Sequence, residues 1–169
     1  MTVWPFKPTN KFSESLEWLT SIHSAKTREQ RSALRTMPRQ FYSLSHWLNP
    51  AQYSRAKRIA ASLFNNGGDG SIQLPLWAEM ATVASITSGA MAITVDTSSG
   101  QYLAGGEAIV WVSDTNYELV AIDSLNSTTL TLSAGVVGDY VNCTVAPVAT
   151  AWVNKKMAVP RKPGRYQEA

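Results

Sequence analysis

Short runs rich in β-branched residues repeat through the second half of this 169-residue chain. Five such runs occupy residues 91–96, 107–112, 118–123, 128–132 and 140–145. The segments between them are rich in glycine, serine and asparagine, which favour turns. Strands of this length at this spacing are typical of a meander, a small barrel or a sandwich. Residues 81–154 are therefore predicted to form a small all-β module.

A capped helix is the clearest feature of the first half of the chain. Asn49 suits the N-cap, Pro50 suits the first helical position, and Gln52 can complete a capping box. One apolar stripe follows at helical spacing: Ala56, Ile59, Ala60, Leu63 and Phe64. Residues 65–68 read Asn-Asn-Gly-Gly and supply a left-handed cap. The sequence thus predicts a helix over residues 50–65.

The segment before the helix carries weaker signals. Polar and apolar positions alternate over residues 16–22 with one exception, which favours a strand. The spacing of Leu16, Leu19 and His23 also suits a helix, so that alternative stays open. Pro38 would break a helix, or would place a strand at the edge of a sheet.

These patterns predict an α+β, mainly β fold. Residues 1–80 are expected to form a domain with a β-hairpin and the helix, ending in a strand at 72–77 that Pro75 marks as irregular. Residues 81–154 are expected to form a small β-barrel or β-sandwich. Residues 155–169 are proline-bounded and basic, and are expected to be an extended C-terminal arm.

The net charge of +3 conceals a segmental pattern. Residues 1–80 contain ten Lys and Arg against five Asp and Glu. Residues 81–154 contain six acidic residues and no Lys or Arg, and the last fifteen residues contain five basic residues against one acidic. Such alternation suits a protein whose copies or neighbours meet through opposite charges. Two domains and a tail would show the same pattern equally well by chance.

Cysteine usage and hydropathy narrow the class of protein. Cys143 is the only cysteine, which excludes an internal disulfide framework and multi-cysteine zinc sites. The start of the sequence shows no basic leader followed by an apolar stretch, and no run reaches the length of a membrane span. We therefore expect a soluble protein that is synthesised in a reducing, cytoplasmic environment.

The sequence provides little for catalysis. Its two histidines, His23 and His46, have no Gly-x-Ser-x-Gly motif near them, and the acidic residues of 81–154 fall mostly at predicted strand ends. Residues 65–71 are rich in oxygen ligands but lack the alternating acidic residues and the distal glutamate of a calcium loop. We expect no enzymatic activity, no cofactor and no metal site.

Six tryptophans are many for this length, and large aromatic residues dominate both cores and permanent interfaces. The residues predicted to anchor cores are Trp18, Ile59, Leu63, Phe64, Trp77 and Trp111. Trp4 and Phe6 lie among prolines near the start of the chain, where little local structure is expected to cover them. We therefore predict that these two residues dock on another subunit.

Arginines cluster in the first domain and near the C-terminus. The interface candidates among the basic residues are Arg28, Arg31, Arg35, Arg39, Lys155, Lys156, Arg161 and Arg165. With Phe41 and Tyr42 nearby, the first four could line a surface for nucleic acid, and the C-terminal arm could contact a phosphate backbone. No nucleic-acid reader motif accompanies them, so subunit contacts are the favoured interpretation.

The order of features between Leu16 and Trp77 resembles the N-terminal domain of the distal tail proteins of long-tailed bacteriophages and gene transfer agents. A Trp-containing segment leads into Glu29-Gln30-Arg31, then into a Pro-Arg-Gln-Phe segment, the capped helix, and an apolar segment that ends at Trp77. The glycine that usually precedes Glu-Gln-Arg is replaced here by Thr-Arg. The resemblance covers about the first half of the chain.

This resemblance implies a structural role in the virion. Distal tail proteins form the ring that joins a tail tube to its tip, so the implied partners are further copies of the chain in a homohexamer and other tail proteins of the tube, hub or fibre. It implies a location in the tail tip, no sequence-specific nucleic acid and no membrane in the assembled resting state.

Two alternatives stay open at this stage. The chain could be another virion component, such as a hub, a collar or a head-to-tail connector. It could also be a carbohydrate-binding β module, because β-sandwiches with exposed aromatic residues often hold sugars. That second alternative requires Trp111 and Tyr117 to be exposed together.

Overall fold

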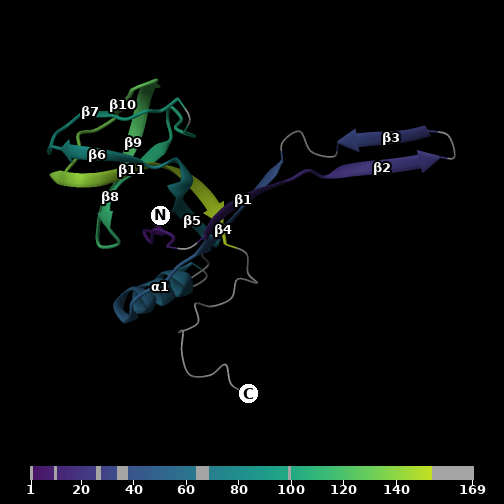
Figure 1. Cartoon of the computed structure of the whole chain (residues 1–169), viewed down its shortest axis with the longest axis horizontal. Helices are drawn as coiled ribbons and strands as arrows, with labels where there is room; N and C mark the ends of the chain where they lie inside the picture. Colours follow the sequence, from purple (N-terminus) through teal and green to yellow (C-terminus); the bar gives the residue numbers. More distant parts are fainter. Residues whose placement is uncertain are drawn as a thin grey trace, which may run out of the picture. The chain divides into compact units, whose positions relative to one another are not determined.

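The computed structural model describes residues 2–9, 11–25, 28–33, 38–63, 69–98 and 100–153, with the backbone alone for 20–25 and 28–33. The chain forms two compact units, shown with their elements in Figure 1. One unit comprises Met1–Lys7 together with Leu48–Ala169, and we call it the main unit. The other is Pro8–Trp47, which we call the β-arm.

The β-arm consists of two antiparallel ladders. Strand β1 (Lys11–Glu17) pairs with β4 (Arg39–Ser45), and β2 (Thr20–Ala25) pairs with β3 (Arg28–Ala33). The chain therefore runs in one direction along β1 and β2 and returns along β3 and β4. The predicted strand over residues 16–22 is confirmed in type, but it is interrupted at Trp18 and Leu19. Each ladder has two strands and no further layer within the described part of the β-arm.

The main unit contains a seven-stranded sheet. Its strands are β5 (Ser71–Pro75), β6 (Ala81–Ile86), β7 (Ala92–Thr94), β8 (Glu107–Ser113), β9 (Asn116–Asn126), β10 (Thr129–Leu132) and β11 (Tyr140–Trp152). The order is β5-β11-β8-β9-β10-β7, and β6 also pairs with β11. All these pairs are antiparallel. Strand β11 is central, because its first half pairs with β6 and its last residues pair with β5.

One apolar core joins the strands from β6 to β11. Its fully buried members include Val110 in β8, Ile122 in β9, Leu130 in β10 and Val145 in β11. Each is at most 1% exposed. Since apolar residues alternate along these strands, one face of the sheet supplies this core.

Helix α1 (Pro50–Ser62) belongs to the main unit, and its predicted start is confirmed. The Asn49 side chain accepts a hydrogen bond from the Gln52 amide at 2.9 Å, and the Gln52 side chain accepts one from the Asn49 amide at 3.1 Å. A short 3-10 helix, η2 (Trp77–Glu79), follows β5. The helix ends three residues before the predicted position, and the predicted cap at 65–68 lies outside the described residues.

The predicted α+β, mainly β class is confirmed at the level of antiparallel sheets with one α-helix in the described parts of the chain. All five predicted β runs of the second half contain strands. The predicted boundary at residue 80 differs from the observed division into units, because β5 pairs with β11 across that boundary. The predicted C-terminal arm, residues 155–169, lies outside the described residues.

Candidate interaction surface

The first residues of the chain lie on the chain's own sheet. Val3 forms a parallel bridge with Gln73 of β5. The Trp4 amide donates to the Gln73 carbonyl at 2.9 Å, and the Gln73 amide donates to the Thr2 carbonyl at 2.8 Å. Phe6 is only 2% exposed and lies edge-on to Trp4 with ring centroids 5.1 Å apart. The prediction that this segment docks on another subunit is therefore wrong for Phe6, which is buried within its own chain.

This N-terminal segment covers the outer face of the sheet. Val3 packs in a cluster with Ile109 and Ala146, on the face opposite the main core. The indole Nε1 of Trp111 donates to the Pro5 carbonyl at 2.8 Å. Trp111 and the neighbouring Tyr117 are consequently half-buried rather than exposed together. The two rings therefore do not form the jointly exposed pair that a sugar-binding platform requires.

Helix α1 is tied to the β8–β9 turn by polar contacts. The Gln52 side-chain Nε2 donates to Asp114 Oδ1 at 3.1 Å. Arg55 Nη1 lies 3.6 Å from Asp114 Oδ2 and also donates a hydrogen bond to the Asp114 main-chain carbonyl. The Arg55 guanidinium also lies 6.0 Å from the centre of the Tyr117 ring. Because both charged side chains are largely covered, this pair fixes one side of the helix against the sheet.

The predicted core residues lie in different environments. Trp77 and Leu63 are 4% and 5% exposed, and Ile59 and Trp111 are half-buried. Phe64 lies outside the described residues. Trp18 is 57% exposed, so it is not a core residue of this chain. The physical reason is that Trp18 interrupts a two-stranded β-arm, which has no second layer to cover it.

Large apolar side chains are exposed along the β-arm. They are Leu16, Trp18, Leu19, Phe41 and Trp47, at 44–68% exposure. Isolated two-stranded ribbons are at best marginally stable in water, and exposed apolar groups of this size mark surfaces that bind other proteins. The exposed faces of the β-arm are therefore the candidate interaction surface of this protein.

The arginines predicted as interface candidates do not share one strand. Arg28 and Arg31 lie in β3, whereas Arg39 begins β4, where it is exposed and lies opposite Glu17 of β1 in the register. Arg31 and Arg39 therefore lie in different ladders and do not share one strand face. Arg35 and the four basic candidates of the C-terminal residues lie outside the described parts of the chain.

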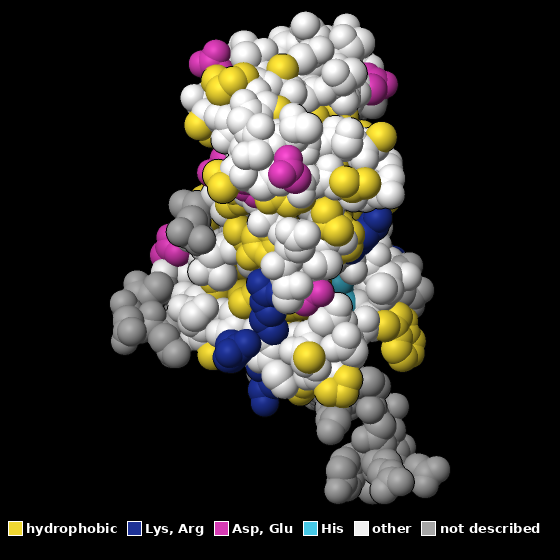
Figure 2. Space-filling model, turned by 90° about the vertical axis from the view of Figure 1, so that its left-hand side faces the viewer, with side chains coloured by type: hydrophobic (Ala, Val, Ile, Leu, Met, Phe, Trp, Pro, Cys, Tyr) yellow, Lys and Arg dark blue, Asp and Glu magenta, His cyan; other side chains and the backbone are white. Residues whose placement is uncertain are grey.

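Charge is segregated within the main unit as well. Lys57 and Arg58 are exposed on α1, and residues 81–153 contain no Lys or Arg. Figure 2 shows Lys and Arg side chains mainly in the lower half of the face in view and acidic side chains mainly in its upper half, with an acidic side chain also lying among the basic ones. Strands β6 to β11 therefore present an acidic surface to any neighbour.

Buried titratable groups in the main unit have structural roles. The Glu118 carboxylate accepts hydrogen bonds from the Val137 amide at 2.9 Å, the Gly138 amide at 3.3 Å and the Tyr140 hydroxyl at 3.0 Å, which ties down the loop before β11. Burial raises the pKa of Tyr140 to about 12, and the hydrogen bond to Glu118 contributes. Burial also raises the pKa of the Cys143 thiol, which keeps it protonated and unreactive.

Alkaline pH is expected to destabilise the protein through Tyr140. A tyrosine ionises near pH 10 in an unfolded chain, so the contribution of Tyr140 is fully present below about pH 10 and is lost as the pH rises through about 12. We expect the free energy of unfolding to fall by about 1 kcal/mol between pH 8 and pH 11 on this account. Urea unfolding at both values measures it. The Tyr140→Phe variant should lack this part of the loss, and equal losses in both proteins would refute the assignment.

Within the described residues, no group of three or more His, Cys, Asp or Glu side chains is arranged to hold a metal ion. No helix of the described chain has the length and apolar character that crossing a bilayer requires. No protein family model matches this sequence, and no curated protein matches it either. The function is therefore argued from the β-arm and from the surfaces of the main unit.

Proposed function

We propose that this chain is a non-enzymatic structural subunit of a phage-like tail tip or baseplate, in which copies form a ring that joins the tail tube to the tip. The order of elements supports the proposal. A hairpin with Glu29-Gln30-Arg31 in its second strand is followed by β4, by the capped helix α1, and by β5 leading to Trp77. This is the order that the distal tail proteins show in their N-terminal domain.

The β-arm is the observation that carries this proposal. It exposes five large apolar side chains on ladders of two strands, and the described residues supply no layer that covers them. Edge strands of this kind bind a neighbouring chain through main-chain hydrogen bonds, while aromatic side chains provide affinity. A closed cyclic array satisfies such head-to-tail contacts, whereas an open array would polymerise.

The second part of the proposal concerns the sheet of the main unit. Its end strands β6 and β7 line one pocket, and strands β6 to β11 share one core. Both features support a small β-barrel with an open seam. Small barrels of this kind are appended to many phage tail and baseplate proteins.

Trp18→Ala should separate folding from assembly. Since Trp18 is 57% exposed, the substitution is expected to change the free energy of unfolding by less than about 0.5 kcal/mol. We expect incorporation into particles to fall at least tenfold, because exposed aromatic residues often dominate the affinity of an interface. Thermal unfolding and immunoblots of purified particles measure the two effects.

Leu103→Ala is the matched control, because Leu103 is 69% exposed but lies in the main unit. This substitution should change neither the free energy of unfolding nor the amount of the chain in particles. If Trp18→Ala particles contain the chain at the normal level, the β-arm is not the assembly surface.

A reconstruction of the native particle tests the ring itself. We expect a closed ring on the tube axis, with six copies. A lone monomer, or a threefold spike away from the axis, would contradict the proposal. A position at the head end of the tail would favour the alternative of a collar or head-to-tail connector, and a position on the axis below the ring would favour a hub.

Binding of duplex DNA is expected to be weak. Arg28 and Arg31 lie in a different ladder from Arg39, and no reader motif accompanies them. Titration of labelled duplex at near-physiological salt should give a Kd of about tens of micromolar or weaker, with a steep dependence on salt. Nanomolar binding that persists at about 200 mM salt would instead establish a nucleic-acid-binding protein.

A further inference from the structure

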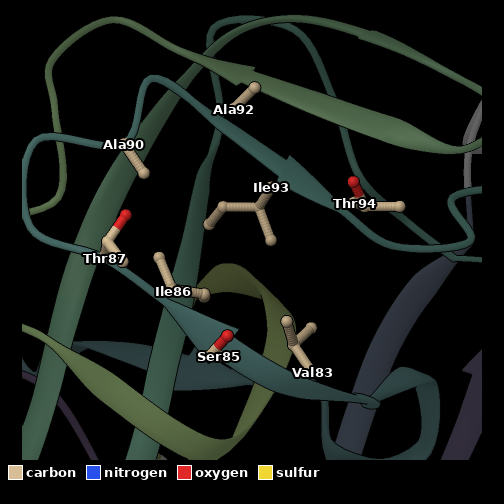
Figure 3. Close-up of a pocket in the computed structure, with 8 residues that line it drawn as sticks. All are labelled: Val83, Ser85, Ile86, Thr87, Ala90, Ala92, Ile93 and Thr94. Atoms are coloured by element: carbon tan, nitrogen blue, oxygen red, sulfur yellow. The ribbon is translucent and has the colours of Figure 1, made fainter.

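A pocket of about 240 Å³ lies between β6 and β7. Figure 3 shows Ile86 of β6 and Ile93 of β7 projecting toward the space between the two strands, and Thr87 and Ala90 where the chain turns from one strand to the other. Small-molecule sites typically span about 300–1,000 Å³, so this pocket suits one large side chain better than a whole ligand.

The edges beside this pocket are open. Among the described residues, β6 pairs only with β11 and β7 pairs only with β10, so each strand has one edge without a neighbour. None of the eight residues that line the pocket is charged. Its lining is mixed, because apolar side chains such as Ile86 and Ile93 alternate with the hydroxyl groups of Ser85, Thr87 and Thr94. Such a site fits an apolar side chain presented by a β-strand.

Exposed carboxylates flank the pocket at both ends. Asp139 accepts a hydrogen bond from the Ser88 amide at 2.8 Å, directly after Thr87 of the pocket. Asp96 follows Thr94 by two residues and accepts hydrogen bonds from Ser98. Residues 81–153 contain no Lys or Arg, so no basic side chain from this part of the chain neutralises the charges of Asp96 and Asp139. The favoured occupant is therefore apolar with basic neighbours.

The β-arm has this combination. Leu16, Trp18 and Leu19 are each at least 45% exposed and lie together at the gap between β1 and β2. Arg39, which is exposed, lies opposite Glu17 in the register and so begins β4 beside this cluster. Over its whole length the β-arm carries six basic and three acidic residues. Its charge is thus opposite to that of the sheet.

We infer that the β-arm of one copy docks on the main unit of a second copy, with Trp18 inserted into the pocket between β6 and β7. This inference rests on the proposed function, because it assigns the surface through which neighbours in the ring meet. Trp18 fills the uncharged pocket, Arg39 faces a flanking carboxylate, and the open edges of β6 and β7 lie beside the strands of the incoming β-arm.

Disulfide trapping between two variants, each with one added cysteine, tests this inference. Leu19→Cys, which keeps Trp18 and replaces an exposed neighbour of it, is mixed at high concentration with Thr94→Cys that carries a tag of different mass, and the mixture is oxidised. We expect the mixed dimer in at least tenfold excess over the dimer that Leu19→Cys forms with a tagged Leu103→Cys control. The native Cys143 is 0% exposed, so it does not compete.

A large side chain at the mouth of the pocket should prevent the contact. Thr87 lines the pocket where the chain turns from β6 to β7 and is itself exposed, so Thr87→Trp can cover the space without displacing the core. Added to the Thr94→Cys variant, it should reduce the mixed dimer at least tenfold while the melting temperature stays unchanged. Equal yields with Thr94→Cys and Leu103→Cys, no mixed dimer at the highest soluble concentration, or no effect of Thr87→Trp would overturn the inference.

Failure of this inference and failure of the proposed function give different results. If native particles contain the ring but the mixed disulfide does not form, the ring stands and the docking surface is elsewhere. If the disulfide forms but the chain occupies no ring in the particle, self-association through the pocket stands and the tail-tip function fails.

Discussion

Replacing Trp77 with alanine is expected to lower the free energy of unfolding by about 3–5 kcal/mol. Trp77 is 4% exposed and packs edge-on against Trp111, with ring centroids 5.4 Å apart. It follows β5 and precedes β6, so it lies where β11 changes from one neighbour to the other. A loss of this size approaches the whole stability of a small domain. Urea unfolding followed by circular dichroism measures it.

Two further variants make this result interpretable. Trp152→Ala removes an indole that is 68% exposed and should cost less than about 0.5 kcal/mol. The buried Nε1 of Trp77 has no hydrogen-bond acceptor among the described residues, so Trp77→Phe removes an unsatisfied donor and should cost much less than alanine. If Trp77→Ala melts normally and only assembly is lost, Trp77 is an interface residue instead.

Phe6→Ala is the second substitution with a large expected effect, also about 3–5 kcal/mol. Phe6 is 2% exposed, and the segment that carries it covers the outer face of the sheet. Loss of the ring leaves a cavity beneath this segment, and the main-chain hydrogen bonds that join Thr2 and Trp4 to Gln73 then hold the segment less well. Thermal unfolding of the purified variant measures the loss, and Phe6→Leu should restore most of it.

This prediction changes the meaning of a deletion experiment. Removal of residues 1–8 should abolish incorporation into particles. The same result would be expected if this segment docked on another subunit. In this structure the cause would be the uncovered outer face of the chain's own sheet. A Phe6→Ala protein with normal stability would show that the segment contributes little within its own chain.

Local sequence signals were sufficient for the helix and for most strands. The Asn49, Pro50 and Gln52 pattern predicted the start of α1, because capping involves only residues next to one another in the chain. The five β-branched runs predicted strands β7 to β11 for a similar reason, since alternation and turn residues are local properties.

Two features of the sheet had no adequate local signal. Strand β6 consists mainly of alanine, serine and threonine with few large apolar residues, and its pairing with β11 stabilises it. Strand β11 continues through Pro147, a residue that usually ends a strand. Pro147 lies between the residues that pair with β6 and those that pair with β5, where its missing N–H is not required. The pocket between β6 and β7 was therefore also not predictable.

The environment of each tryptophan likewise depended on the tertiary structure. The sequence predicted that Trp18 is a core residue and that the proline-flanked segment with Phe6 docks on another subunit, whereas Trp18 is exposed and Phe6 is buried in its own chain. Burial requires a second layer: β5 and the outer face of the sheet supply one for Phe6, whereas the two-stranded β-arm supplies none for Trp18.

The sequence by itself determined the mainly β class, the capped helix and the separation of basic from acidic segments, because propensity, capping and charge are properties of residues and their near neighbours. Only the tertiary structure decided which strand edges stay open, which aromatic side chains are covered and where the pocket lies. These features depend on contacts between segments such as β5 and β11, which are more than sixty residues apart in the chain, and no local pattern encodes such pairings.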